Sequence, residues 1–588
     1  MARRLIRFGS WLGVIMASRC NILGCVALLL VSCGGNAIRP FPAQAPFARD
    51  TDLNSVRVAC HEAPSKKDPA HVSCAPAEYV SPLAWDGMDN SIFRPFSEVF
   101  AVKKSKEAVN ANSLDEVADS AWFTNRIGVK PFSEDELRLG ACRSEQYLDG
   151  TSAADGEWLI DKGKGNGASL GFRVNIKGKG KYLFKADIPT QPERPSAASV
   201  IGAAAYHAAG FFTSCEQVVF FKPSVLKLAP GLTYEDNSGI ERRFDQRALE
   251  RVLASATKRG DYIRMQASAW LPGALLGPFR YEGTRDDDPN DVIPHQDRRE
   301  LRGGRLLAAW LDHFDAREQN TMDSWIANDK KVPDSSPGYV RHYYLDTSDC
   351  LGSDWAWDGI SRRLGRSYLL DWGDIGHDFI TLGIQVRSWE KLERVPGFEM
   401  FGYFDAEHFV AEEWKNEYPN PAFSNMTERD GAWMARILAR FTPESVATLA
   451  ELGRFADPKT THYLAGVLEG RLERVLSRYL TRLSPLSDVR VSDRQLCAVD
   501  LARWRSVTSS APVSYSVSSS DHERLALTAG PDGQVCVTLP SNSATAVRPP
   551  RFTVSISNGI AGPLLVQLYD LGNERGYAIA GLERPEAS

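Results

Sequence analysis

Apolar residues between positions 157 and 187 fall into three short runs separated by glycine-rich or polar stretches. Each run has the length and composition of a β-strand, and the expected strands are Trp158–Ile160, Leu170–Ile176 and Tyr182–Ala186. The first connection contains Gly163, Gly165 and Gly167, and the second, Lys177–Gly180, is typical of a turn. The pattern therefore predicts a hairpin with a glycine-rich connection, followed by a third strand.

After these strands, the middle of the chain is predicted to be helical. A run of small residues, Ser196–Ala209, ends at Gly210, and an apolar strand is expected at Gln217–Phe221. Arg298–Phe314 carries apolar residues at helical spacing and predicts a long helix. Later helices begin where a polar cap residue precedes proline or an acid, at Thr427 with Asp430, Thr442-Pro443 and Asp457-Pro458. The last helix has a one-sided apolar stripe that indicates core packing: Leu464, Leu468, Leu472, Val475, Leu476 and Tyr479.

After Pro485 the apolar residues alternate with polar ones, which is typical of strands with one buried face. The alternating positions are Val513, Tyr515 and Val517, Leu525 and Leu527, Val535, Val537 and Leu539, Phe552, Val554 and Ile556, and then Leu564–Tyr569. A turn at Gly530–Gly533 joins two of these segments. The pattern predicts a small antiparallel β-sandwich of about 100 residues, without residues suited to catalysis.

The N-terminus has the features of a secretory signal. Basic residues (Arg3, Arg4 and Arg7) precede an apolar stretch, and residues 22–31 are too few to span a bilayer. Leu30-Val31-Ser32-Cys33 resembles the lipobox of bacterial lipoproteins, which implies cleavage before Cys33 and acylation of its thiol. No acidic residue follows Cys33, so the resemblance favours the outer membrane, on its periplasmic face or at the cell surface. An ordinary signal peptide is the alternative, and a start at Met16 would give a more compact signal.

Composition and charge narrow the function classes. The 588 residues are 43% hydrophobic and 24% charged with a net charge of −5, which indicates a globular protein of two or three domains and no nucleic-acid partner. Among the ten cysteines, the pairs Cys60–Cys74 and Cys497–Cys536 are close enough in sequence to be disulfides in an oxidising compartment. Cys142, Cys215 and Cys350 are expected to be buried singly. No Cys-x-x-Cys spacing indicates a zinc cluster.

One segment carries residues suited to phosphoryl transfer. His313-Phe-Asp315 is followed by Asn320, and in such reactions an Asp accepts a hydroxyl proton while an Asn five residues later holds a metal ion. Upstream, Lys185 lies among apolar strand residues, where a lysine is costly to bury unless it meets an anion such as a nucleotide phosphate. Downstream, an apolar strand ends at Asp346, the position expected for a second metal ligand.

Several of these residues have plainer interpretations. The glycine-rich loop is also typical of a flexible hairpin, and Lys185 of a side chain that reaches solvent along an apolar surface. His313 is also compatible with a structural histidine, and Asp315 with a local ion pair to Arg317. Asp371 is the alternate metal ligand, because Asp371-Trp372-Gly373 is closer to the kinase Asp-Phe-Gly tripeptide than Asp346 is. The acidic run Asp286–Asp291 fits either a calcium loop or a solvated loop.

The chain resembles a family of uncharacterised exported bacterial proteins with a kinase-like core, over about residues 107–485. The segments that carry the resemblance are Asn112–Arg126, Gly277–Thr284 through Arg298–Gly303, Asp315–Asn320, Arg341–Gly352 and Tyr418–Phe423. The core is similar to atypical kinases of the HipA, phosphatidylinositol-kinase and CotH type. The chain departs from such kinases in having Ser199 where an acid would pair with Lys185, and Thr347-Ser348 after Asp346.

Together these observations predict an α+β protein with a two-lobed kinase-like core and a small all-β sandwich. The expected parts are a signal peptide (1–33), a tether and N-terminal extension (34–106, with 34–75 as the tether), the core (107–485) and the sandwich (486–588). Within the core, the lobes are expected at about 150–222 and 223–485.

Two functions remain open at this stage. The first is an atypical phosphotransferase that uses ATP or another nucleotide with Mg²⁺ or Mn²⁺ and transfers a phosphoryl or nucleotidyl group to an unknown protein or glycan acceptor. Its expected residues are Asp315 with His313 for catalysis, Gly165, Gly167 and Lys185 for the nucleotide, and Asn320 with Asp346 for the metal. The second is an inactive pseudokinase-like envelope protein that binds a partner or glycan. A hydrolase is disfavoured, because the sequence has neither a nucleophile elbow nor a His-Glu-x-x-His motif.

Overall fold

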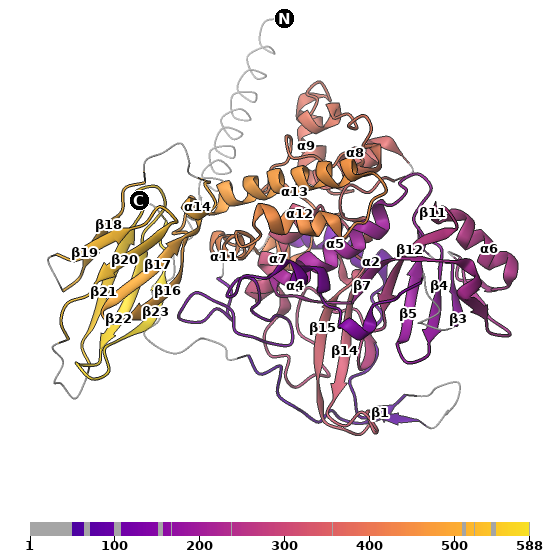
Figure 1. Ribbon diagram of the computed structural model, residues 1–588, viewed down its shortest axis with the longest axis horizontal. Helices are drawn as coiled ribbons and strands as arrows, with labels where there is room; N and C mark the ends of the chain where they lie inside the picture. The colour runs from indigo at the N-terminus through magenta and orange to yellow at the C-terminus, as the bar shows by residue number, and fades with distance from the viewer. Residues whose placement is uncertain are drawn as a thin grey trace, which may run out of the picture. The chain divides into compact units, whose positions relative to one another are not determined.

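The computed structural model describes residues 50–63, 71–98, 107–150, 157–165, 167–236, 238–355, 357–507, 513–521, 524–542 and 549–586. The chain divides into two units, Met1–Pro40 and Phe41–Ser588, and every described residue belongs to the second (Figure 1). The expected signal peptide and Cys33 lie outside the described residues. The described part is a mixed α+β structure with several sheets, which confirms the α+β class.

The largest sheet contains the three strands expected near the glycine-rich loop. Its strands follow the order β11-β12-β5-β4-β3-β8, and β7 also pairs with β12. The bounds are β3 Trp158–Lys164, β4 Gly171–Ile176, β5 Gly180–Lys185, β7 Glu216–Phe221, β8 Leu226–Leu228, β11 Thr257–Arg259 and β12 Tyr262–Ala269. Because β12 pairs with β5 and β7, the sheet continues past residue 222, where we expected the first lobe to end.

Three smaller sheets complete the N-terminal and middle parts of the described chain. A four-stranded sheet has the order β13-β14-β15-β6, and two further pairs are β1-β2 and β9-β10. The bounds are β1 His61–Glu62, β2 Val72–Ser73, β6 Phe212–Thr213, β9 Thr233–Glu235, β10 Glu241–Arg243, β13 Ala274–Gly277, β14 Thr321–Ala327 and β15 Gly338–Tyr344. The β14–β15 hairpin leads directly into Asp346.

Most helices lie between the C-terminal sheets and the sheets formed by residues before 345 (Figure 1). Their bounds are α2 Leu83–Met88, α3 Arg94–Glu98, α4 Glu134–Leu139, α5 Arg194–Ala209, α6 Gln246–Ser255, α7 Arg299–Leu311, α8 Asp358–Arg363, α9 Trp372–Thr381, α10 Pro421–Ser424, α11 Glu428–Leu438, α12 Pro443–Glu451, α13 Pro458–Tyr479 and α14 Leu501–Trp504. The caps predicted at Thr427, Thr442 and Asp457 are confirmed, because each side chain accepts a backbone N–H of its own first turn.

Helix α7 is shorter than the helix predicted over Arg298–Phe314. It ends at Leu311 because Asp312 adopts a left-handed backbone with φ 56°. The Asp312 carboxylate accepts a hydrogen bond from the Trp414 indole at 2.9 Å, a contact between segments that lie far apart in sequence. As a consequence His313 lies outside the helix, in the loop that leads to Asp315.

The N-terminal extension is not a free tether where it is described. Arg298 is fully buried, and its guanidinium forms ion pairs with Asp50 at 2.6 Å and Asp52 at 3.6 Å. Val58 and Ala75 are buried in an apolar cluster with Trp325. The expectation of a tether is therefore wrong for the described residues between 50 and 75, because a buried arginine requires these acids as partners.

The strands after residue 485 form two antiparallel sheets around one apolar core (Figure 1). One sheet has the order β16-β17-β20-β19 and the other β18-β21-β22-β23. The bounds are β16 Leu486–Ser492, β17 Gln495–Asp500, β18 Ser516–Ser519, β19 Ala526–Ala529, β20 Gln534–Thr538, β21 Arg551–Ser557, β22 Leu564–Asp570 and β23 Tyr577–Glu583. The inward positions include Val535, Val537, Val554 and Ile556, as the alternating pattern requires.

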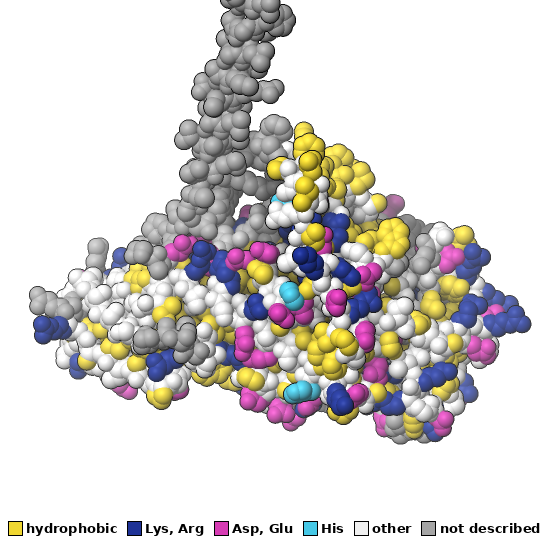
Figure 2. Space-filling model, turned by 90° about the horizontal axis from the view of Figure 1, so that it is seen from above, with side chains coloured by type: hydrophobic (Ala, Val, Ile, Leu, Met, Phe, Trp, Pro, Cys, Tyr) yellow, Lys and Arg dark blue, Asp and Glu magenta, His cyan; other side chains and the backbone are white. Residues whose placement is uncertain are grey.

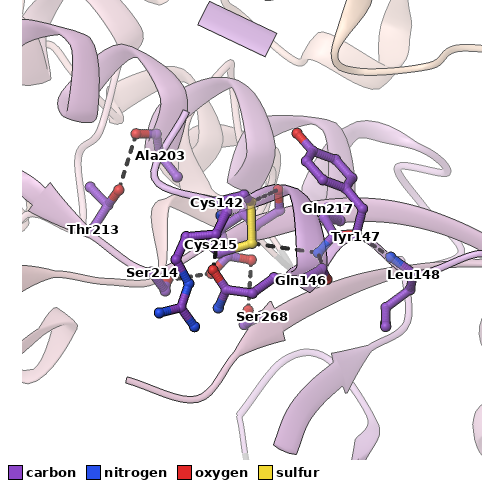
Figure 3. Close-up of a disulfide and its surroundings, with 12 residues drawn as sticks. Cys142, Gln146, Tyr147, Leu148, Ala203, Thr213, Ser214, Cys215, Gln217 and Ser268 are labelled. Atoms are coloured by element: carbon purple, nitrogen blue, oxygen red, sulfur yellow. Dashed lines mark hydrogen bonds between the residues drawn. A yellow bond between two sulfur atoms is a disulfide. The ribbon is translucent and has the colours of Figure 1, made fainter. Parts of the chain in front are cut away.

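Three disulfides are present among the described residues. Cys60–Cys74 and Cys497–Cys536 are bonded. Cys142 and Cys215, which we expected to be buried singly, form the third disulfide (Figure 3). The expectation failed because residues far apart in sequence meet only in the fold: the bond joins the segment after α4 to the segment before β7. Cys350 remains a free buried cysteine.

Replacing Cys142 and Cys215 by alanine should lower the free energy of unfolding by about 2–4 kcal/mol, since a cross-link restricts the unfolded chain. The bond closes a loop with a sequence separation of 73. Denaturant unfolding followed by near-UV circular dichroism measures the loss. Cys350→Ala is the control for cysteine removal, and an equal loss in this control would contradict the prediction.

In the parts of the chain that the structure describes, none of the helices combines the length and the hydropathy that crossing a bilayer requires.

Candidate functional site

The fold brings Lys185 and Asp346 into direct contact. Lys185 is the last residue of β5, Asp346 follows β15, and the Nζ and Oδ1 atoms lie 2.8 Å apart. Lys185 is buried, whereas 40% of the Asp346 side chain is exposed. Burial raises the pKa of Asp346, but the Lys185 ammonium and hydrogen bonds from Lys185 and Ser348 outweigh it and hold the pKa below its usual range. Asp346 is therefore a partly exposed anion that is paired with a buried cation.

The turn that carries Asp346 is held by helix α5. Asp346 has a left-handed backbone with φ 48°, an uncommon conformation for a residue other than glycine. The Thr347 hydroxyl donates to the Ser199 carbonyl at 3.0 Å, and Arg194 donates to the carbonyls of Ser348 and Cys350 at 2.8 Å. These long-range contacts compensate for the cost of the strained backbone, so Asp346 is fixed rather than adaptable.

The β14–β15 hairpin places Asn320 next to Asp346. Thr321 pairs with Tyr344 in the hairpin. Beyond this pair, the Leu345 N–H donates to the Asn320 carbonyl at 2.9 Å. The Asn320 side-chain amide donates to the Asp315 carbonyl at 2.7 Å. Asp315, Asn320 and Asp346 therefore share one end of the hairpin.

Asp315 lies in a cluster of acids around one arginine. Its Oδ1 atom is 2.6 Å from the Arg317 guanidinium, which also pairs with Glu417. Its backbone N–H donates to Asp349 Oδ2 at 2.9 Å. Burial raises the pKa of Asp315 well above its usual value despite Arg317, and the neighbouring Asp349 and Glu417 raise it further. Asp315 is therefore a buried carboxyl held by one guanidinium among other acids.

His313 does not have the exposed position of a catalytic histidine. It is fully buried, its Nδ1 atom lies 2.9 Å from the Tyr206 hydroxyl, and its Nε2 atom lies 3.4 Å from Asp349. Burial lowers the pKa of His313 to about 4, so the ring is neutral at pH 7. His313 contacts Asp349, whose carboxylate accepts the backbone N–H of Asp315, and its catalytic role stays a prediction.

The glycine-rich loop brings a second lysine to the site. Lys164 donates to the Ser169 carbonyl at 2.9 Å, and burial lowers its pKa to about 8, with a further contribution from the positive charge of Lys185. Gly167 has φ +77°, which a glycine adopts at little cost. At Gly165 a Cβ atom would collide with the ring of Tyr234, so packing alone explains that glycine.

Asp371, the alternate metal ligand, is a helix cap in the structure. Its carboxylate accepts the N–H groups of Gly373 and Asp374 at 3.0 and 3.2 Å, which caps α9. It also forms an ion pair with Lys415 at 2.5 Å. These contacts account for the residue without a ligand, and the geometry favours Asp346 over Asp371 as the acid beside Lys185.

The acidic run at Asp286–Asp291 is part of the folded core. Asp288 and Asp291 are buried, and Asp291 lies 2.7 Å from the His295 ring. Arg285 forms ion pairs with Asp287 at 2.8 Å and with Asp323 at 3.0 Å. The acids are partners of internal bases, so the solvated-loop interpretation does not hold for the buried members of this run.

Sequence reasoning missed several residues of the site. Lys164 was detectable as a second lysine within the glycine-rich stretch, and Asp349 as the acid three residues after Asp346. Glu417 has no local signal. The same holds for Glu216 on β7, whose pKa burial raises although the charge of Lys185 opposes this shift. Glu216, on a strand, is therefore an acid near Lys185, whereas such an acid was expected at the position of Ser199 on helix α5.

The residues present fit a metal ion that is shared with a nucleotide. In the described part of the chain, no three His, Cys, Asp or Glu side chains gather closely enough to hold a metal by themselves. Magnesium in phosphoryl-transfer sites is typically bound by one or two protein groups together with substrate phosphates and water. Asp346 Oδ1 contacts Lys185 and Ser348, which leaves its second oxygen, with the amide oxygen of Asn320, to act as ligands.

Comparison of the chain with family models, with curated proteins and with solved structures gave no match.

Proposed function

We propose that this protein is an exported lipoprotein whose residues 107–485 form a two-lobed, kinase-like phosphotransferase. The observation that carries the proposal is the 2.8 Å ion pair of Lys185 with Asp346, next to Asn320 and Asp315 on adjoining backbone. The separate apolar clusters of the seven-stranded sheet and of the helices support two lobes. The product of the reaction would be a phosphorylated or nucleotidylated protein or glycan.

Each residue has a role that its environment supports. Lys185 and the nearby Lys164 would hold the nucleotide phosphates. Asp346 and Asn320 would hold Mg²⁺ or Mn²⁺. The ion supplies neutralisation of the charge on the transferred group. Asp315 would orient the acceptor hydroxyl and accept its proton. His313 and Asp349 would hold the loop in place.

The cysteine pattern supports export. Six described cysteines are paired in three disulfides, and such bonds persist in oxidising compartments. With the lipobox-like sequence before Cys33, this favours a protein that is anchored by lipid to the outer membrane and meets its acceptor outside the cytoplasm.

The second candidate function is a pseudokinase-like envelope protein that binds a partner or glycan. Two observations favour it: the ring of Tyr234 packs against Gly165 of the glycine-rich loop, and Thr347-Ser348 follow Asp346 in place of the kinase Phe-Gly. This function requires no metal-dependent nucleotide binding, which separates it from the first.

A thermal-shift titration of residues 34–588 tests the choice. ATP, ADP, AMP and GTP are added with and without Mg²⁺ or Mn²⁺, and a ligand of the folded state should raise the melting temperature by about 3 °C at one hundred times its Kd. The shift should require the metal and disappear in Asp346→Asn. Asp119→Asn, at an exposed acid that bonds Asn125, is the matched control and should keep the shift. No shift at millimolar nucleotide would favour the binding protein.

A further inference from the structure

Helix α9 and the loop after it carry an apolar surface that the proposed reaction does not use. Four side chains there are more than 80% exposed, and we call them the apolar tip: Phe379, Ile380, Leu382 and Ile384. Ile375 and Val386 are about half exposed, at 45% and 50%. In the view from above, hydrophobic side chains gather in a projecting group at the horizontal position of α8 and α9 (Figures 1 and 2). Such an accumulation is rare on a monomeric surface and marks an interaction site.

A leucine at position 382 is unfavourable for the stability of the folded chain. It ends α9 in a left-handed conformation with φ 51°, a position that favours glycine or asparagine. Its side chain is 82% exposed and therefore gains little from packing within the chain. A strained and exposed leucine is best explained by burial against a partner.

Three backbone N–H groups of the tip have partners within the chain. The N–H groups of Leu382 and Gly383 donate to the Asp378 carbonyl, and the Ile384 N–H donates to the Thr381 carbonyl at 3.1 Å. The Thr381 hydroxyl donates to the His377 carbonyl at 2.9 Å. These three N–H groups would therefore need no partner in the acyl region of a bilayer, which offers none. A protein partner would not require this arrangement.

The apolar tip carries no charged side chain, and the positive and negative charges of the surrounding segment are equal in number. Residues 379–386 contain no charged side chain, while residues 357–394 contain six Lys or Arg and six Asp or Glu. Arg387, the first charge after the tip, pairs with Asp378 at 2.7 Å and Glu390 at 2.9 Å. The surface therefore offers apolar contact without a net charge, which suits lipid acyl chains of either zwitterionic or anionic membranes.

We propose that the apolar tip inserts into the interfacial region of a phospholipid bilayer and holds the core against the membrane. The expected lipid anchor lies close enough in sequence to permit this, because the 16 residues between Cys33 and Asp50 span at most about 60 Å. An apolar wedge and a lipid anchor attach more firmly together than either does alone.

Vesicle co-sedimentation tests the proposal on residues 34–588, which contain the compact unit Phe41–Ser588 and lack the acylated cysteine. Phosphatidylcholine vesicles should bind the parent chain equally at about 0.05 and 0.5 M salt, since screening weakens only charge-driven binding. The tip variant carries Phe379→Gln, Ile380→Gln, Leu382→Asn and Ile384→Gln. It should bind at least tenfold more weakly, while its melting temperature stays equal or rises, because asparagine suits the left-handed position.

The matched control replaces four valines elsewhere that are more than 50% exposed by glutamine: Val80, Val129, Val292 and Val332. It should bind vesicles within twofold of the parent. A fluorescent label at Gln385→Cys should report an apolar environment on vesicle addition, and the free cysteine among the described residues, Cys350, is buried. Absence of parental binding, or equal losses in both variants, would overturn the proposal. A dimer that the tip variant dissociates, without vesicle binding, would assign the tip to a second copy of the chain instead.

Discussion

Replacing Asp115 by alanine should lower the free energy of unfolding by about 4–6 kcal/mol, the largest loss of stability we expect from one substitution. Asp115 is buried and lies 2.7 Å from Arg299 on α7, 3.4 Å from Arg436 on α11 and 2.8 Å from Arg584 after β23. Its removal would leave buried guanidinium groups without their shared anion, and alanine tolerates its left-handed φ of 60° poorly. Because Arg584 follows the last strand, the loss should also loosen the C-terminal sheets.

Two further substitutions separate the effect of losing the charge at Asp115 from the effect of its left-handed backbone. Asp115→Asn tolerates the left-handed conformation and removes only the charge, so it should retain about 1 kcal/mol more than alanine does. Asp493→Ala alters an exposed aspartate with φ 45° and should cost about 1 kcal/mol. Denaturant unfolding provides the values, and a loss for Asp115→Ala no larger than that for Asp493→Ala would refute the ion-pair account.

The same contact has a pH dependence with a defined sign. Burial raises the pKa of Asp115, but Arg299, Arg584 and Arg436 outweigh it and hold the pKa below its usual value. A carboxyl whose folded pKa is depressed contributes stability above its unfolded pKa of about 3.9, and this contribution is lost as the pH falls further. The difference in stability between parent and Asp115→Asn should therefore shrink on acidification below about pH 4.

Asp315→Asn should reduce nucleotide-dependent transfer by a factor on the order of 10² to 10³ if the proposed phosphotransferase operates. The amide keeps the size of the carboxyl but cannot accept the acceptor proton. Transfer of label from γ- and α-labelled ATP to envelope proteins and glycans measures the rate and also distinguishes phosphoryl from nucleotidyl transfer. Nucleotide binding in the thermal-shift titration should persist, because Asp315 is not expected to hold the nucleotide.

Asp371→Asn is the comparison that decides between the two candidate acids. Asp371 caps α9 and pairs with Lys415, so its replacement should lower the melting temperature slightly and leave transfer unchanged. Asp346→Asn should abolish both metal-dependent binding and transfer. A loss of transfer in Asp371→Asn with none in Asp346→Asn would move the metal site to Asp371, and equal rates in Asp315→Asn and the parent would end the catalytic proposal.

Local patterns were sufficient for part of the fold. The strands β3, β4 and β5 follow from apolar runs punctuated by glycine, and the starts of α11, α12 and α13 follow from their capping residues. Alternation after residue 485 was likewise sufficient for strands with one buried face. These features depend on hydrogen bonds and burial within a few residues, which is why periodicity alone indicates them.

The site was predictable only in part. Residue type and order indicated Lys185, Asp315, Asn320 and Asp346 as candidates, and the structure brings them together. The sequence indicated neither that Lys185 pairs directly with Asp346 nor that His313 is buried beneath the loop. Asp349, Glu417 and Glu216 gain their roles from contacts between segments that are distant in the chain.

The sequence by itself therefore determined the class of the protein, the main strands and helix starts, and the residue types available for chemistry. Only the tertiary structure decided where α7 ends, which cysteines pair across 73 residues, and which acid faces Lys185. It also decided that residues 50–63 pack on the core, and that the apolar side chains of α9 face outward. The physical reason is range: a cap or an alternating strand is stabilised by its neighbours in sequence, whereas a buried ion pair, a disulfide or an exposed apolar face depends on which distant segments meet.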